Sequence, residues 1–67
     1  MNIGDKVKEA REERNMSQYR LAKITGISSS YISELENGKY RNPSAEVLMK
    51  LSRALGISVS KLLSKAS

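Results

Sequence analysis

The sequence predicts an all-α fold of five short helices, and two kinds of residue predict it. Serine or asparagine precedes each of five stretches with helical apolar spacing, and such side chains cap the exposed N–H groups of a first helical turn; they are Asn2, Ser17, Ser28, Ser44 and Ser58. Three glycines stand where stretches end, namely Gly26, Gly38 and Gly56. No stretch alternates like a strand, and 67 residues allow a single domain, expected over residues 1–67.

The first helix is expected from Ile3 to about Arg14. Its inward stripe is Ile3, Val7 and Ala10, which recur at helical spacing. Asp5 lies in the first turn, where a negative charge suits the positive end of the helix dipole.

The next two helices form a unit over about residues 17–37. Leu21 and Ala22 face inward from the first of them, and Ile32 and Leu35 face these residues from the second. Gly26 accepts the positive φ that a sharp turn requires. Because helices joined by so short a turn cross steeply, the crossing needs a small residue, and Ala22 is the candidate. This spacing is typical of a helix-turn-helix, although ordinary helical corners share it.

A polar, basic loop from Lys39 to Pro43 separates this unit from the last two helices. The fourth helix is expected between Ser44 and Gly56, and the fifth after Ser58. Their apolar residues recur at helical spacing; they are Val47, Leu48, Leu51, Ala54 and Leu55 in the fourth helix and Val59, Leu62 and Leu63 in the fifth.

The composition excludes several classes of protein. Twelve lysines and arginines stand against seven acidic residues, and the net charge of +5 favours a polyanionic partner. Without Cys or His there can be no disulfide, no thiolate or imidazole zinc site and no Cys or His catalysis, so we expect no metal and no cofactor. Glu9, Glu12 and Glu13 are expected on a solvated helix face rather than in a catalytic pair, so no enzyme is expected.

Nothing in the sequence predicts a membrane segment. No apolar run approaches the roughly 20 residues that span a bilayer. Asp5 and Glu9 stand where a signal peptide would be apolar. We therefore expect a cytoplasmic protein with no membrane partner.

Seven short motifs occur in an order that spans Ile3 to Leu63. They are Gln18, Leu21-Ala22, Gly26-Ile27-Ser28, Tyr31-Ile32-Ser33, Glu36-Asn37-Gly38, Asn42-Pro43-Ser44 and Leu55-Gly56-Ile57. This ordered set resembles the Xre/Cro/cI family of prokaryotic and phage repressors, and residues 42–44 and 57–60 are especially similar to the DNA-binding domain of SinR-type regulators. The resemblance implies a compact five-helix, lambda-repressor-like domain. It also implies a regulator of transcription, most often a repressor, that binds double-stranded operator DNA at the nucleoid.

The resemblance also implies which residues contact DNA. The helix from Ser28 to Asn37 would lie in the major groove, and its outward residues are the expected base readers: Ser29, Ser30, Ser33 and Glu34. Phosphate contacts are expected from Ser17, Gln18, Tyr31, Asn37, Lys39 and Arg41. Tyr31 could instead only cover the core, and Lys39 and Arg41 could be solvated loop charges.

Three of the four expected base readers are serines, and this departs from family members that carry Gln, Arg or Lys there. A single hydroxyl fits several bases, so discrimination falls to Glu34 and to DNA shape. Glu34 either accepts a hydrogen bond from the N4 amino group of cytosine or, if it lies near a phosphate, rejects wrong registers by repulsion.

Two further expectations concern contacts within and between chains. In phage repressors, positions matching Arg11 and Glu36 form an interior ion pair, and two exposed charges are the alternative here. A homodimer is expected on DNA, because one helix with short readers covers few base pairs; its surface would come from Val59, Leu62 or Leu63 and the loop after Gly38. The alternative function is a protein-interaction module on the same fold, such as an antitoxin or a partner of another regulator.

Overall fold

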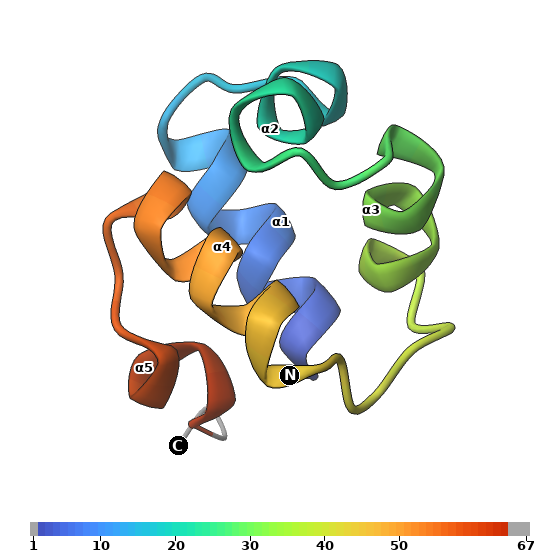
Figure 1. Ribbon diagram of the computed structural model, residues 1–67. Coiled ribbons are helices and arrows are strands. Elements are labelled where there is room, and N and C mark those ends of the chain that lie inside the picture. Colours follow the sequence, from blue (N-terminus) through green and yellow to red (C-terminus); the bar gives the residue numbers. More distant parts are fainter. Residues whose placement is uncertain (1, 65–67) are drawn as a thin grey trace.

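The computed structural model describes residues 2–64, and all the regular structure in them is helical (Figure 1). The five helices are α1 (Ile3–Glu13), α2 (Gln18–Thr25), α3 (Ser29–Glu36), α4 (Ala45–Leu55) and α5 (Val59–Leu63). Residues 1 and 65–67 of the expected domain lie outside the described residues. The predicted number, order and type of elements are therefore confirmed.

Each helix begins after the side chain that the sequence predicts as its cap. Ser17, Ser28, Ser44 and Ser58 each accept a hydrogen bond from the backbone N–H three residues on. At Asn2 the cap is reciprocal, because the Asp5 carboxylate also accepts from the Asn2 N–H. These bonds satisfy donors that would otherwise be unpaired at the start of a helix.

The first helix ends one residue earlier than the sequence predicts. Its last residue is Glu13, and Arg14 is the C-cap. The N–H groups of Arg14 and Asn15 turn back to the carbonyl oxygens of Arg11 and Glu12. Asn15 then takes a φ of +53°, a conformation that asparagine tolerates better than most residues.

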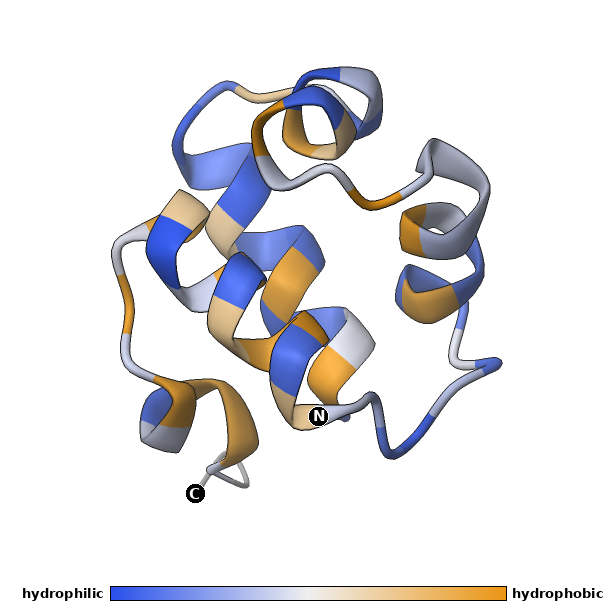
Figure 2. Ribbon diagram, in the orientation of Figure 1, coloured by the Kyte–Doolittle hydropathy of each residue, from blue (hydrophilic) through white to orange (hydrophobic). Residues whose placement is uncertain are grey.

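The core is built from all five helices around α1, which packs against α3, α4 and α5. Figure 2 shows the apolar segments of α3 and α4 turned toward α1. The fully buried side chains of the core are Val7, Leu21, Ile32, Leu35, Leu51, Leu55 and Leu62. The expected inward stripes are confirmed, but the expectation that Leu62 could join a dimer surface is wrong. Leu62 is 1% exposed because α5 turns this residue onto the core, whereas Leu63 is 54% exposed.

Gly4 allows a close approach between α1 and α3 that the sequence analysis did not predict. A Cβ atom at this buried residue would overlap the carbonyl oxygen of Leu35. Glu36 is the next residue, so this contact fixes the last turn of α3 against the first turn of α1. Glycine is needed here for space rather than for a positive φ.

The described part of the chain contains neither a membrane-spanning helix nor a cluster of metal-ligating side chains. None of the helices in residues 2–64 is long and apolar enough to cross a membrane. Within the same residues, no three or more acidic side chains gather in a way that could hold a metal ion.

Candidate nucleic-acid interface

The turn between α2 and α3 is held by a short set of hydrogen bonds. Gly26 adopts a φ of +77°, and its N–H donates to the carbonyl oxygen of Ala22. The Thr25 hydroxyl donates to the carbonyl oxygen of Leu21 and accepts from the N–H of Ile27. These bonds define the turn after which α3 packs against α2 (Figure 1).

The outer face of α3 carries the four expected base readers. Ser29 and Ser30 are exposed, and Ser33 and Glu34 are half-buried. Together with Gln18 from the first turn of α2, they line a shallow hollow of about 410 Å³. The fold therefore brings side chains from both helices of the helix-turn-helix to one surface.

A buried polar network lies behind this surface and joins three helices. The Glu36 carboxylate accepts from Arg11 Nε at 2.8 Å and from Arg11 Nη2 at 3.0 Å. Arg11 Nη1 donates to the carbonyl oxygen of Met16 at 2.6 Å, in the connection between α1 and α2. The hydrogen bond to Glu36 raises the pKa of Arg11, although burial acts in the opposite direction. The pair links α1 to the end of α3.

Gln18 belongs to this network, which the sequence did not indicate. Its Nε2 donates to the Glu36 carboxylate at 3.0 Å. An amide nitrogen carries two hydrogens, so a phosphate contact from Gln18 would use the second one. The first turn of α2 is thus tied to the last turn of α3.

A second cluster links α3 to the loop that follows it. The two oxygens of the Glu34 carboxylate accept from Lys39 Nζ at 3.1 Å and from the Tyr40 hydroxyl at 3.0 Å. The Tyr40 ring stacks on the Tyr31 ring with centroids 4.6 Å apart and planes 10° apart. Lys39 and then Tyr40, as hydrogen-bond donors, lower the pKa of Glu34. Glu34, which is expected to read bases, and Lys39, which is expected to bind phosphates, are thus partners of each other in the structure.

The other residues expected to contact phosphates come from the N-cap of α2, from α3 and its C-cap, and from the loop after α3. Ser17 is exposed and uses its oxygen as the cap of α2. Asn37 is the exposed C-cap of α3, and Arg41 is exposed in the loop. Tyr31 is half-buried and packs both against the core and on Tyr40. The core packing of Tyr31 is therefore observed, and its contact with a phosphate stays a prediction.

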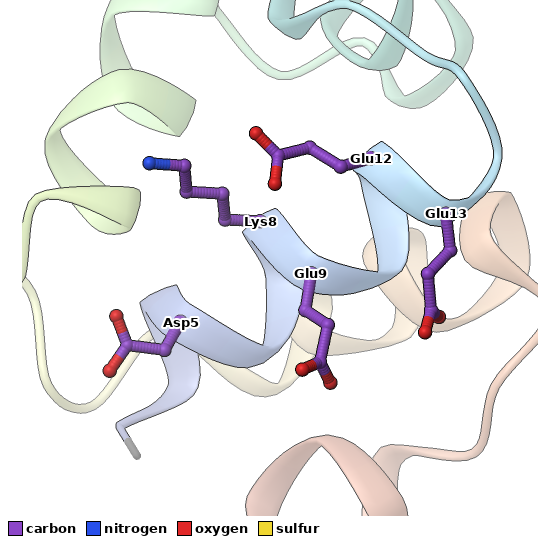
Figure 3. A pocket seen from close by; sticks show the side chains of 5 residues that line it. All are labelled: Asp5, Lys8, Glu9, Glu12 and Glu13. Atoms are coloured by element: carbon purple, nitrogen blue, oxygen red, sulfur yellow. The ribbon is translucent and has the colours of Figure 1, made fainter.

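The carboxylates of α1 lie on the outer surface of that helix. Asp5, Glu9, Glu12 and Glu13 line a hollow of about 530 Å³ together with Lys8, as Figure 3 shows. They are four of the seven acidic residues in the chain. All of these side chains come from one helix, so the hollow is an open surface rather than a cleft between elements.

Residues 2–64 form five helices, and Gln18 of α2 and the outer residues of α3 share one surface. These features define a helix-turn-helix protein. Residues 7–62 match the family described as "Helix-turn-helix", and the chain belongs to this family, in its Xre-type branch. The family comprises DNA-binding regulators of transcription rather than enzymes.

Similar proteins support the same assignment. The chain is 39% identical over 62 residues to an immunity repressor protein of Bacillus phage phi105, covering 92% of this chain and 42% of the relative. It is 39% identical over 61 residues to the transcriptional regulator SinR of Bacillus subtilis, covering 91% of this chain and 55% of SinR. The chain thus spans about half the length of these curated relatives.

Solved structures confirm the predicted lambda-repressor-like fold. A crystal structure of SinR in complex with DNA has a TM-score of 0.89 and 39% identity, covering 92% of this chain and 98% of that chain. The P22 c2 repressor in complex with a synthetic operator has a TM-score of 0.87 and 32% identity, covering 94% of each chain.

Proposed function

We propose that this chain is a sequence-specific DNA-binding regulator of transcription that acts as a repressor. The observation that carries the proposal is the surface formed by Ser29, Ser30, Ser33 and Glu34 on α3 beside Gln18 at the start of α2. The complexes of SinR and P22 c2 repressor with DNA, at 39% and 32% identity, support it. Such binding would place the protein at the nucleoid, in the cytoplasm.

In this proposal α3 lies in the major groove and its outward side chains face the base edges. The serine hydroxyls fit several bases, so Glu34 and the shape of the DNA carry most of the discrimination. Phosphates on either side of the major groove are bound by the residues expected to contact phosphates: Ser17, Gln18, Tyr31, Asn37, Lys39 and Arg41. These contacts set the position of the protein and dominate its salt dependence.

The proposal is tested by placing a charge on the reading face. Ser30→Asp adds a carboxylate at the second residue of α3, and Ser60→Asp adds one at the second residue of α5; both serines are exposed. α5 packs on α1 and α4. Ser30→Asp should abolish preference for a duplex selected from a random pool, and Ser60→Asp should retain it, as measured by fluorescence anisotropy. If the unmodified protein binds no duplex at low salt, the chain is instead a protein-interaction module.

We also propose that two copies bind adjacent half-sites, about 34–36 Å apart, as helix-turn-helix dimers do. Of the apolar residues of α5, Leu63 is exposed and Val59 is half-buried, so these two remain available for a contact. Few exposed apolar groups argue for a monomer in dilute solution that pairs on DNA. Sedimentation at micromolar concentration should show a monomer alone and two chains per palindromic duplex, and a tight dimer without DNA would contradict this.

A further inference from the structure

The carboxylate of Glu34 stands on the reading face with both oxygens occupied by donors from its own chain. Lys39 holds one oxygen, and Tyr40 holds the other. The stack of Tyr40 on Tyr31 fixes the loop donor to the same helix that carries Glu34. We call Glu34, Lys39 and Tyr40 the loop clamp.

The loop clamp neutralises Lys39, a lysine of the loop that follows α3. Lys39 Nζ lies 3.1 Å from a carboxylate oxygen, so the pair presents almost no net charge to an approaching DNA backbone. A phosphate therefore gains the full charge of Lys39 once Lys39 leaves Glu34, and a donor that takes its place on the carboxylate favours that move.

Few groups in the major groove can take that place. Guanine and thymine present acceptors, whereas cytosine presents an N4 amino group and adenine an N6 amino group beside the N7 acceptor. A carboxylate is repelled by acceptors, and cytosine is the base whose edge offers it a donor with no adjacent acceptor on the same base.

We infer that Glu34 determines specificity by exchange: on the operator, the N4 amino group of a cytosine replaces Lys39 on the Glu34 carboxylate, and Lys39 moves to a phosphate. On other sequences Glu34 keeps Lys39, and one phosphate contact is not made. This inference rests on the proposed function. It adds that binding to sequences without this cytosine is weakened by the loss of one phosphate contact. Tyr40 retains its hydrogen bond in both states and holds the carboxylate in place.

The exchange predicts an unusual result for Glu34→Gln. The neutral amide no longer competes for Lys39, so binding to random duplex should tighten. One additional phosphate contact adds about 0.9 to the salt slope. This corresponds to a roughly eightfold gain in affinity between 1 M and 0.1 M salt. Binding to the selected operator should not tighten by this factor, so the ratio of specific to random affinity should fall.

Glu46→Gln is the matched control for this experiment. Glu46 is exposed and, like the half-buried Glu34, is paired with a lysine, since its carboxylate lies 3.5 Å from Lys50 Nζ within α4. The two variants change the net charge equally. Affinity for random duplex and for the selected operator is measured for both across a range of salt, with circular dichroism to confirm folding. Equal behaviour of the two variants would overturn the exchange.

Two further measurements separate the outcomes. In a Glu34→Gln/Lys39→Ala double variant, the gain on random duplex and the extra salt slope should both disappear, and their persistence would overturn the role of Lys39. Replacing the contacted cytosine by thymine should weaken the unmodified protein more than Glu34→Gln. Replacing it by adenine should weaken the unmodified protein but favour Glu34→Gln, because a Gln amide can pair with both N6 and N7 of adenine. Equal tolerance of adenine by the unmodified protein would overturn the assignment to cytosine.

These results also distinguish the exchange from the function on which it rests. Absence of any sequence preference in the unmodified protein would contradict the proposed function. A clear preference in the unmodified protein, together with identical Glu34→Gln and Glu46→Gln variants, would leave that function intact and reject the exchange alone.

Discussion

Glu34 and Glu36 both lie on α3, and each accepts hydrogen bonds from one cationic and one neutral side chain. The two ion pairs differ in how deeply they are buried. The Glu36 side chain is 3% exposed, and its partner Arg11 is 10% exposed. The Glu34 side chain is 42% exposed, and its partner Lys39 is 59% exposed. The two pairs thus differ in burial, and burial determines how much free energy is lost when an ion pair separates.

The energetic reason lies in what happens when one partner leaves. A charge left alone in the interior has no water to replace its partner, whereas an exposed charge is solvated at once. Arg11 and Glu36 therefore hold α3 against α1, and Gln18 extends this link to α2. Separating Lys39 from Glu34 costs little free energy because water can solvate both charges, and the proposed exchange requires this.

The largest expected effect breaks the buried pair. Glu36→Gln leaves Arg11 as an uncompensated buried charge and should lower the free energy of unfolding by about 3–5 kcal/mol. This is a large part of the roughly 3–10 kcal/mol expected for a domain of 67 residues. Urea denaturation followed by circular dichroism measures the loss, and Glu34→Gln, two residues away, should barely change the midpoint.

If Glu36→Gln is too unstable to analyse, an apolar replacement of both partners keeps the prediction testable. Arg11→Met with Glu36→Leu removes both charges, and such replacements of buried pairs are often neutral or stabilising. The double variant should therefore be more stable than Glu36→Gln alone. A Glu36→Gln variant as stable as the unmodified protein would show that the two charges do not depend on each other.

A smaller loss of stability is expected when the packing beside the buried pair is disturbed. Gly4→Ala places a methyl group against the Leu35 carbonyl, and insertion of this kind typically costs about 1–3 kcal/mol. In a domain of this size that corresponds to a Tm lower by about 4–24 °C, at roughly 4–8 °C per kcal/mol. Lys8→Ala, at an exposed residue of the same helix, is the control and should have little effect. An unchanged Tm for Gly4→Ala would mean that α1 and α3 can separate there without loss.

The sequence predicts the features that depend on local spacing and misses the contacts between separate elements. The caps, the inward stripes and the outward readers depend on local spacing, and the structure contains the caps and stripes where the sequence places them. The polar surroundings of Glu34 and Gln18 depend instead on the path of a loop and on the crossing of helices. No spacing rule connects Glu34 with Tyr40 across a turn, or Gln18 with Glu36 across two helices. The space for Gly4 was missed for the same reason, because the Leu35 carbonyl comes from another helix.

The smallest expected effect sharpens the exposed half of the comparison. The hydrogen bond to Glu34 is the main cause that raises the pKa of Tyr40, since ionising the phenol removes the bond and places two negative charges together. A raised pKa means that this contribution to stability is complete below the ordinary tyrosine pKa and is lost as the pH rises through the raised one. Glu34→Gln should therefore bring the pKa of Tyr40 down toward its ordinary value, while Glu46→Gln should leave it unchanged. NMR titration of the tyrosine ring signals, over the pH range in which circular dichroism remains native, measures both. A Tyr40 titration that Glu34→Gln does not move would show that the loop clamp does not form in solution, and the exchange inferred from it would fail as well.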